Sequence, residues 1–488
     1  AKGYGLASLE LSVPISSRTV FDIGSSSKQF TAASIVLLAQ DGKLSLDDDI
    51  RKFIPELPYL GTKVTLRHLL THTSGWRDYV DLMFFGGFDG RDHTTDDDAL
   101  GVLRRQRTLN FIPGSDWRYS NTGFFLMSVV VKRVTGKSLA DFARERIFQP
   151  LGMTNTHYLT DSREVVPNKS TAYSPAPGGG FVIDMSNWEQ IGDGGVQTTV
   201  EDLARWDANF DAPSAAVGGK ALVDLLETTA KLSDGTPLTY ALGLTVDEYR
   251  GLRRVQHGGA WGGFRAMTMR FPSEHLSVYT LCNRGDANTD QLASGVAGVF
   301  LPAQPATLAG TARHASIPGD ATRFAGAYFA EGMGQMLNLD AHGDSLVQRG
   351  NHLALEPLGP GRYRHVPTGA TLTFSDRGIK RVVAQPRGPG ANTVYYAVQP
   401  AGQIHAADYA GSYSSDEMPA AWEIVAHGDT LLLHQPRGED VPIRPLFRDA
   451  FVGPGILRFE RDAAGKVIAL TVTTRGIHAL RMARQPSR

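Results

Sequence analysis

The spacing of apolar residues changes along the chain and separates two kinds of pattern. From Phe30 to Leu38 apolar or small side chains recur at helical spacing, which predicts a helix that ends near Gly42. Residues 200–206 repeat the helical pattern, whereas residues 277–282 form a short apolar run that is typical of a buried strand. Up to about residue 300 the sequence therefore predicts a mixture of helices and short strands.

Beyond about residue 320 the pattern becomes one of short alternating segments separated by Gly and Pro, as in Leu337-Asn-Leu339 and Leu470-Thr-Val472. This alternation predicts antiparallel strands, and closing such strands into small barrels would remove their exposed edges. Residues 302–319 are small and Pro-containing and lack any apolar period, which is typical of a linker.

The C-terminal part also repeats itself. Phe324-Ala-Gly-Ala-Tyr328 recurs as Tyr409-Ala-Gly-Ser-Tyr413, and Ala341-His-Gly-Asp-Ser-Leu346 recurs as Ala426-His-Gly-Asp-Thr-Leu431. Both pairs are offset by 85 residues, because 409 − 324 and 426 − 341 both equal 85. Two similar modules are therefore predicted, which are too few for a solenoid.

These changes of pattern predict the domain organisation. We expect a first domain over residues 1–305 and a linker over 306–319. One β module then occupies residues 320–402 and a second occupies 403–488. The chain begins at Ala1 without a Met or a signal peptide, so we interpret its start as truncated or processed.

Composition excludes several classes of protein. Lys and Arg number 49 against 50 Asp and Glu, so no overall charge attracts nucleic acid or an anionic membrane surface. No apolar run reaches the roughly 18 residues that a membrane helix needs, so no membrane span is predicted. The single cysteine, Cys282, excludes an internal disulfide and any Cys-rich metal site, while the cell compartment stays open.

Ser25 and Lys28 form an S-x-x-K pair at the predicted start of the first helix. Residues three apart share one face of a helix, so the amine can reach the hydroxyl, and the helix N-terminus adds a partial positive charge. A serine beside such a base is a candidate nucleophile. An isolated pair of this kind is more often a helix cap with a solvated lysine, but no other lysine in this chain follows a serine by three residues.

Two further short motifs carry polar side chains suited to the same chemistry. Tyr119-Ser-Asn121 places a phenol and an amide two residues apart, on what we expect to be an extended or turn segment. His257-Gly-Gly259 opens a glycine-rich stretch, expected on a strand edge where a substrate backbone could approach. Each motif is weak alone, yet S-x-x-K, Y-x-N and H-x-G each occur once, in that order.

With these motifs the sequence resembles the serine β-lactamase and penicillin-binding protein superfamily, in the branch that contains class C β-lactamases, D-aminopeptidase and related esterases. Thr65–Trp76, Ile147–Met153 and Gly192–Thr199 also resemble stretches common in that branch. The resemblance covers about residues 1–300. It implies an α+β catalytic domain in which an antiparallel sheet is flanked by helices, a helical region, and an active site between them. It also favours a periplasmic or secreted location.

One motif departs from the β-lactamase pattern. His257-Gly-Gly259 stands where β-lactamases usually have Lys-Thr-Gly, and this variant occurs in D-aminopeptidase-like members. The two repeated β modules also resemble D-aminopeptidase, in which barrels follow the hydrolase domain. The resemblance therefore points toward an amidase rather than a β-lactamase.

Carried over residue by residue, the resemblance implies that Ser25 attacks the substrate carbonyl. Lys28 and Tyr119 would share the proton transfers, and which of the two is the base stays open. Asn121 would bind the substrate amide, and His257 would orient Tyr119 or the substrate.

The same carry-over implies an oxyanion site. The backbone N–H groups of Ser25 and Ala260 would flank the oxyanion, because Ala260 follows Gly259 as the next strand residue. The expected enzyme is a serine hydrolase that forms an acyl-enzyme and cleaves amide or ester bonds of small peptide or amino-acid derivatives, including those of D-amino acids. The sequence predicts no cofactor and leaves the oligomeric state open.

Alternative sites and functions receive less support. His68 and His72 have zinc-helix spacing, but Leu69 stands where a metalloprotease has its glutamate, so packing is the better interpretation. The G-x-S-x-G motif of α/β-hydrolases is absent, and the glycine-rich stretches lack the lysine of a phosphate loop. A carboxylesterase, a class C-type β-lactamase or penicillin-binding protein, and a ligand-binding sensor on an inactive hydrolase fold remain alternatives.

Overall fold

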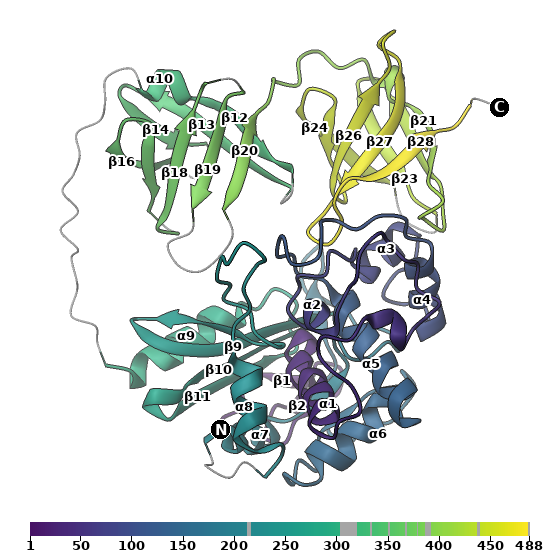
Figure 1. Ribbon diagram of the computed structural model, residues 1–488, viewed down its shortest axis with the longest axis vertical. Coiled ribbons are helices and arrows are strands. Elements are labelled where there is room, and N and C mark those ends of the chain that lie inside the picture. The colour runs from purple at the N-terminus through teal and green to yellow at the C-terminus, as the bar shows by residue number, and fades with distance from the viewer. Residues whose placement is uncertain are drawn as a thin grey trace. The chain divides into compact units, whose positions relative to one another are not determined.

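The computed structural model describes residues 1–211, 216–302, 320–331, 334–349, 352–366, 368–377, 379–385, 392–436 and 440–486. It divides into two compact units (Figure 1). The first contains Ala1–Val80 and Asp89–Pro305, and the second contains Asp81–Phe88 and Ala306–Arg488. The predicted linker at 306–319 lies outside the described residues. We retain the boundaries at 305, 319 and 402 as a proposal.

The first unit mixes helices with short strands, as the apolar spacing predicts. Its α- and 3₁₀- or π-helical elements are η1 (Gly24–Ser27), α1 (Lys28–Gln40), η2 (Ile50–Lys52), α2 (Leu66–Leu70), α4 (Asp96–Arg104), α5 (Asn121–Thr135), α6 (Leu139–Ala143), η3 (Arg144–Phe148), α7 (Val200–Asp211), α8 (Gly219–Glu227), η4 (Pro272–Glu274) and α9 (Thr289–Phe300). Helix α3 (Tyr79–Phe85) begins in this unit. Its strands are β1 (Leu6–Ser8), β2 (Val13–Pro14), β3 (Phe21–Asp22), β4 (His157–Tyr158), β5 (Tyr173–Pro175), β6 (Phe181–Ile183), β7 (Val196–Thr198), β8 (Thr245–Tyr249), β9 (Leu252–Trp261), β10 (Phe264–Phe271) and β11 (Leu276–Cys282).

The main sheet of this unit is antiparallel, in the order β11-β10-β9-β8. Helix α9 packs on β10 and β11, where Met269, Phe271 and Ala297 belong to one buried cluster. Helix α1 lies in the helical region and contacts α5, α6 and α8. Its residues from Lys28 to Leu38 are all buried, as expected for a helix that is surrounded by protein.

The second unit holds the two predicted β modules. The first module contains α10 (Asp320–Phe324), β12 (Gly326–Ala330), β13 (Gln335–His342), β14 (Ser345–Gln348), β15 (Leu353–Ala354), β16 (Glu356–Gly359), β17 (Arg362–His365), β18 (Ala370–Ser375), β19 (Arg381–Gln385) and β20 (Thr393–Ala397). Its nine strands form one antiparallel sheet with β15 and β16 at opposite ends. Only Leu355 separates these two strands along the chain, so the sheet must curl until its edges nearly meet.

The second module is a closed eight-stranded barrel. After η6 (Ala406–Asp408) it consists of β21 (Gly411–Ser414), β22 (Trp422–His427), β23 (Thr430–His434), β24 (Val441–Phe447), β25 (Ala450–Val452), β26 (Ile456–Arg461), β27 (Val467–Thr473) and β28 (Leu480–Arg484). Closure pairs β21 with β28, so no strand edge is left exposed. The predicted α+β domain followed by two antiparallel, barrel-like modules is confirmed.

The sequence repeat corresponds to a repeated packing device. Tyr328 is fully buried, and its hydroxyl donates to the backbone oxygen of Phe324 at 2.7 Å. Tyr413, at the equivalent repeat position, is also fully buried and donates to the backbone oxygen of Tyr409 at 2.7 Å. Each module therefore begins by satisfying a buried phenol with the carbonyl four residues earlier.

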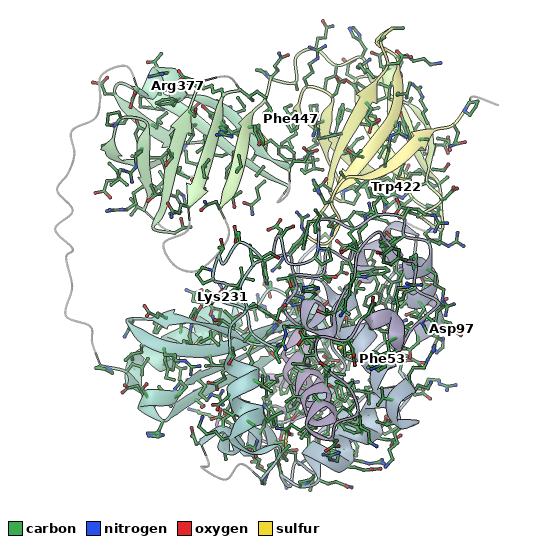
Figure 2. The ribbon with its side chains drawn as sticks, in the orientation of Figure 1. Phe53, Asp97, Lys231, Arg377, Trp422 and Phe447 are labelled. Atoms are coloured by element: carbon green, nitrogen blue, oxygen red, sulfur yellow. The ribbon has the colours of Figure 1, made fainter. Side chains whose placement is uncertain are left out.

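Residues 81–88 group with the C-terminal unit, which the sequence analysis did not predict. Trp422, labelled in Figure 2, is fully buried and donates its indole N–H to the backbone oxygen of Phe85 at 2.9 Å. The rings of Phe85 and Trp422 also meet edge to face, with centroids 5.0 Å apart. A buried indole needs such an acceptor, which accounts for the grouping. None of the described helices is long and apolar enough to span a membrane.

Candidate active site

Ser25 lies in the short helix η1, immediately before α1 begins at Lys28. Gly24 has a positive φ of 48°, and a Cβ there would lie only 2.6 Å from the backbone N of Ala260. The backbone N of Gly24 donates to Asp22 Oδ1 at 2.7 Å, while burial raises the pKa of the Asp22 carboxyl. Glycine is therefore needed at position 24 so that η1 can lie directly against β9.

The amine of Lys28 is completely buried and has three hydrogen-bond partners. Its Nζ lies 3.0 Å from Ser25 Oγ, 2.8 Å from Asn121 Oδ1 and 2.7 Å from the backbone oxygen of Asp193. The ring of Tyr119 is also close, with its centroid 4.9 Å from Nζ. The structure thus brings the S-x-x-K and Y-x-N motifs together around one amine.

Tyr119 and Asn121 belong to a segment that leads into a helix. Asn121 is the first residue of α5, rather than part of a turn, and its backbone N donates to Asp78 Oδ2. The Tyr119 ring packs on His72, with centroids 4.3 Å apart, and is only partly exposed. Asn121 Oδ1 accepts from Lys28, so the amide positions the lysine as well as facing the cavity described below.

His257 lies on β9 and contacts a residue that the sequence analysis did not select. Its Nε2 lies 2.9 Å from the hydroxyl of Tyr240, and its Nδ1 lies 2.6 Å from the backbone oxygen of Gly258. A carbonyl oxygen can only accept, so Nδ1 carries a proton, and in the neutral ring Nε2 accepts from Tyr240. The ring centroids of His257 and Tyr119 are 6.3 Å apart.

The glycines after His257 allow β9 to approach the serine helix. Strand β8 pairs with β9 from Leu252 to Gln256, and β9 continues beyond this register to Trp261. There η1 contacts β9, and a Cβ on Gly259 would lie 1.8 Å from the backbone oxygen of Ile23. The expected strand edge is therefore observed, and it places Ala260 against Gly24 and Ser25.

Ser25 opens into a cavity of roughly 140 Å³. Its polar lining includes Asp22, Ser25, Asn121, Lys169, Gln190 and Asp193, and its apolar lining includes Leu159, Met185, Trp188, Trp261 and Phe264. The rings of Trp188 and Trp261 meet at 5.6 Å between centroids. A small ligand with an apolar side chain and a few polar groups fits such a lining.

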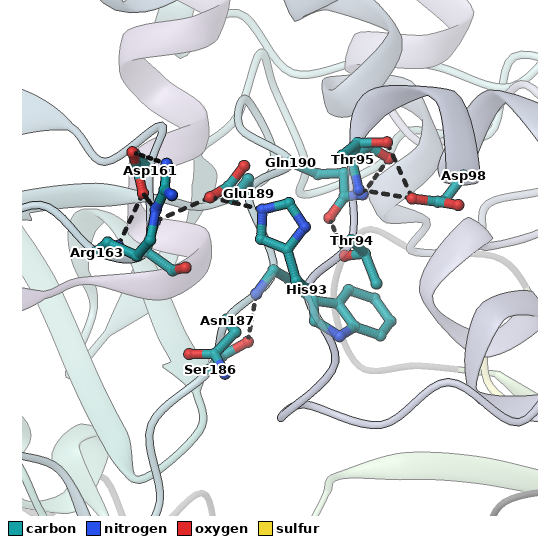
Figure 3. Close-up of polar contacts among 12 residues, drawn as sticks. His93, Thr94, Thr95, Asp98, Asp161, Arg163, Ser186, Asn187, Glu189 and Gln190 are labelled. Carbon is teal, nitrogen blue, oxygen red and sulfur yellow. Dashed lines mark hydrogen bonds and ion pairs between the residues drawn. The ribbon is translucent and has the colours of Figure 1, made fainter.

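The lining segment from Ser186 to Gln190 is held by contacts with residues 93–95 and by the backbone N of Ser162, which donates to Glu189 at 3.1 Å (Figure 3). Gln190 accepts from the Thr94 hydroxyl at 2.9 Å and donates to the backbone oxygen of Thr95. Glu189 lies 3.1 Å from the His93 ring nitrogen. These contacts fix the wall that carries Trp188, so this side of the cavity is formed in advance of ligand binding.

Asp193 is a further residue of the cavity that sequence reasoning did not single out, although it lies in a quoted family stretch. Its side chain is 9% exposed, and Tyr79 donates its hydroxyl to Oδ2 at 3.0 Å. Burial raises the pKa of this carboxyl to about 6, against an opposing effect of the Lys28 charge. The signal available in the sequence was an acidic residue between glycines, Gly192-Asp-Gly-Gly195.

The two histidines considered as zinc ligands have packing and capping contacts. His68 accepts from the backbone N of Thr65 at the start of α2. His72, with a φ of 59°, accepts from the backbone N of Ser120 and lies against the ring of Tyr240. Among the described residues no group of three His, Cys, Asp or Glu side chains could hold a metal ion.

Comparison with known proteins identifies the family. The beta-lactamase family model matches residues 1–298, which is more than half of the chain. The chain belongs to the β-lactamase family. The resemblance based on the motifs is therefore confirmed, and this β-lactamase-family protein is a serine hydrolase with the fold that the family implies.

Two relatives and one solved structure illustrate the similarity. The chain is 28% identical to a D-aminopeptidase of Brucella anthropi over 490 residues, covering 96% of this chain and 89% of the relative. It is 27% identical to penicillin-binding protein 4* of Bacillus subtilis over 394 residues, covering 76% and 84%. An octameric penicillin-binding protein homologue from Pyrococcus abyssi shares the fold, with a TM-score of 0.56 at 21% identity, covering 89% of this chain and 91% of that chain.

Proposed function

We propose that Ser25 is the nucleophile of this hydrolase and forms an acyl-enzyme. The observation that supports this role most directly is the 3.0 Å contact between Ser25 Oγ and Lys28 Nζ at the floor of a ligand-sized cavity. The base, Lys28 or Tyr119, takes the hydroxyl proton while Oγ bonds to the substrate carbonyl carbon. The protonated base gives this proton to the leaving amine or alcohol as its bond to the carbonyl carbon breaks. Water then attacks the acyl carbon, its hydroxyl becomes part of the product carboxyl group, and its other proton passes through the base to Ser25 Oγ as the acyl bond breaks.

Lys28 and Tyr119 are the groups that we assign to these proton transfers. Both lie beside the nucleophile, since the Tyr119 ring is 4.9 Å from the Lys28 amine. The backbone N–H groups of Ser25 and Ala260 are assigned to the oxyanion, because Gly24 and Gly259 bring η1 and β9 into direct contact. Asn121 faces the cavity and can bind the substrate amide.

For the substrate, we propose amide or ester bonds of small peptide or amino-acid derivatives, with D-amino acids on the acyl side. The similarity to a D-aminopeptidase along 96% of the chain supports this choice. The small cavity, with its apolar wall and few polar groups, suits an aminoacyl group. Because the acyl-enzyme chemistry is shared, a carboxylesterase is the second candidate, and the similarity to a penicillin-binding protein keeps β-lactams on the test panel.

The nucleophile is tested by labelling with a fluorophosphonate and measuring intact mass. We expect one adduct on the wild type and none on Ser25→Ala. Ser186→Ala is the matched control, because Ser186 is the other serine among the described lining residues and no step is assigned to its hydroxyl, so labelling should stay intact. Labelling that persists in Ser25→Ala would refute the assignment.

Substrate class is tested by comparing D- and L-aminoacyl p-nitroanilides, short p-nitrophenyl esters and nitrocefin. We expect the highest kcat/KM for a D-aminoacyl anilide. A preference for simple esters would instead favour the carboxylesterase, and a preference for nitrocefin would favour a β-lactamase.

A further inference from the structure

Asp193 lies next to the nucleophile, although neither proton transfer nor the oxyanion site needs its carboxylate. Its backbone oxygen accepts from Lys28 Nζ at 2.7 Å, and that amine lies 3.0 Å from Ser25 Oγ. Both Asp193 and Ser25 line the same cavity. A ligand in this cavity can therefore meet Ser25 and Asp193 at the same time.

One oxygen of the Asp193 carboxylate has no hydrogen-bond partner among the described residues. Oδ2 accepts from the Tyr79 hydroxyl at 3.0 Å, but Oδ1 is buried and has no hydrogen bond among the described residues. Burying a carboxylate oxygen without a hydrogen-bond donor costs free energy, so this unpaired oxygen needs an explanation. A ligand that donates hydrogen bonds would supply the missing partner.

Two other polar side chains of the cavity, those of Asp22 and Gln190, already have hydrogen-bond partners. Asp22 accepts from the backbone N of Gly24 at 2.7 Å and from Gln197 Nε2 at 2.7 Å. Gln190 uses its oxygen and nitrogen for Thr94 and Thr95. Among the described carboxylates that line the cavity, Asp193 is thus the one with an oxygen left for a ligand.

We propose that Asp193 Oδ1 binds the α-ammonium group of the substrate and makes this enzyme selective for aminoacyl groups with a free amine. An α-ammonium nitrogen lies about 2.5 Å from the adjacent carbonyl carbon, so its binding group must stand beside the nucleophile. Asp193 is a candidate for this group because it lines the same cavity as Ser25, and its backbone oxygen and Ser25 Oγ both contact Lys28 Nζ. The assignment rests on the proposed function of Ser25 and specifies its substrate class.

The charges around the cavity are consistent with this role. Tyr79 fixes the carboxylate from α3, while Lys28 and Asp96 face it from α1 and α4. Lys169 is the basic group among the described residues of the lining, and it lies near Asp22, the second carboxyl of the lining. Removing Asp193 or Lys169 should therefore change the preference for a cationic substrate in opposite directions, because the two charges differ in sign.

The test compares D-alanyl p-nitroanilide with propionyl p-nitroanilide, which differs only in lacking the amine. We expect the wild type to favour the alanyl compound in kcat/KM, and Asp193→Asn to reduce that ratio about 30-fold, as for loss of a charged hydrogen bond. Lys169→Met, which removes the opposite charge from the same cavity, should keep or raise the ratio. An equal loss for both anilides in Asp193→Asn would overturn the proposal.

A second measurement needs no turnover. D-Alanine amide and propionamide are compared for their ability to slow fluorophosphonate labelling of Ser25. We expect stronger protection by D-alanine amide in the wild type and equal protection in Asp193→Asn, with Asp193→Ser as a second variant. Labelling with equal protection in the wild type would overturn the role of Asp193 alone, whereas absence of labelling at Ser25 would overturn the proposed function and this assignment together.

Discussion

Substitution of Gly259 by alanine tests whether the contact between β9 and η1 builds the active site. The new Cβ would lie 1.8 Å from the backbone oxygen of Ile23 and 2.8 Å from its carbonyl carbon. Real Cβ contacts do not fall below 3.0 Å, so the strand must move by about 3.0 − 1.8 = 1.2 Å. Both obstructing atoms are backbone, which leaves no flexible side chain to absorb the change.

Such a shift moves Ala260 away from Ser25, because Ala260 follows Gly259 directly on β9. A misplacement of about 1 Å at reacting groups can lower a rate about 100-fold, and overpacking costs about 1–3 kcal/mol of stability. We therefore expect Gly259→Ala to reduce kcat/KM about 100-fold and to slow fluorophosphonate labelling, while the domain stays folded.

Gly258→Ala is the matched control, because neighbouring residues of a strand point to opposite faces. Its nearest contact would be the flexible tip of Met267 at 3.3 Å, with the next atom at 3.8 Å. Activity and the melting temperature are measured for both variants. If Gly259→Ala matches Gly258→Ala in kcat/KM, the close approach of β9 to η1 does not determine the geometry of the site.

The remaining predictions concern three side chains of the cavity and its surroundings. Tyr119→Phe should lower kcat about 100-fold without changing the melting temperature, because the ring can keep its packing on His72; near-normal turnover would make the phenol structural. Tyr240→Phe removes the hydroxyl that lies 2.9 Å from His257 Nε2 and should lower kcat/KM about fivefold to tenfold; an unchanged value would show that His257 needs no such partner. Asp193→Asn should raise the melting temperature at pH 7.5 more than at pH 4. In the folded wild type the pKa of Asp193, about 6, exceeds the ordinary 3.8. Ionised Asp193 therefore lowers the free energy of unfolding, by an amount that grows as pH rises between these values and reaches about 3 kcal/mol above pH 6. A thermal shift that does not depend on pH would contradict this reasoning.

The parts of the site that the sequence predicts are those encoded at short range. Ser25 and Lys28 lie one helical turn apart, so the spacing alone predicts their contact, now seen at 3.0 Å. The glycines after His257 likewise predict a close approach of another backbone, which the structure shows between Gly259 and Ile23. The 85-residue repeat predicts two alike modules, and Tyr328 and Tyr413 indeed make the same hydrogen bond.

The contacts that escaped prediction join residues far apart in the chain. Tyr79 and Asp193 are separated by 114 positions, and Phe85 and Trp422 by 337. Tyr240 and His257 are only 17 positions apart, yet they come from a loop and a strand whose packing no periodicity specifies. The sequence alone does not show that Tyr240 contacts His257, so the sequence analysis predicted only that His257 orients Tyr119 or the substrate.

Asp193 shows why local rules fail at a buried polar group that the described residues do not fully satisfy. Apolar periodicity and charge patterns predict groups that are satisfied within the fold, such as the buried Tyr328. A nine-tenths buried carboxylate with an oxygen that has no hydrogen bond among the described residues breaks those rules, and burial raises its pKa. Under the proposed assignment, an ammonium group bound at Oδ1 would offset the free-energy cost of burying the carboxylate. This gain is available only to a substrate with a free amine, so it contributes to selectivity rather than to folding.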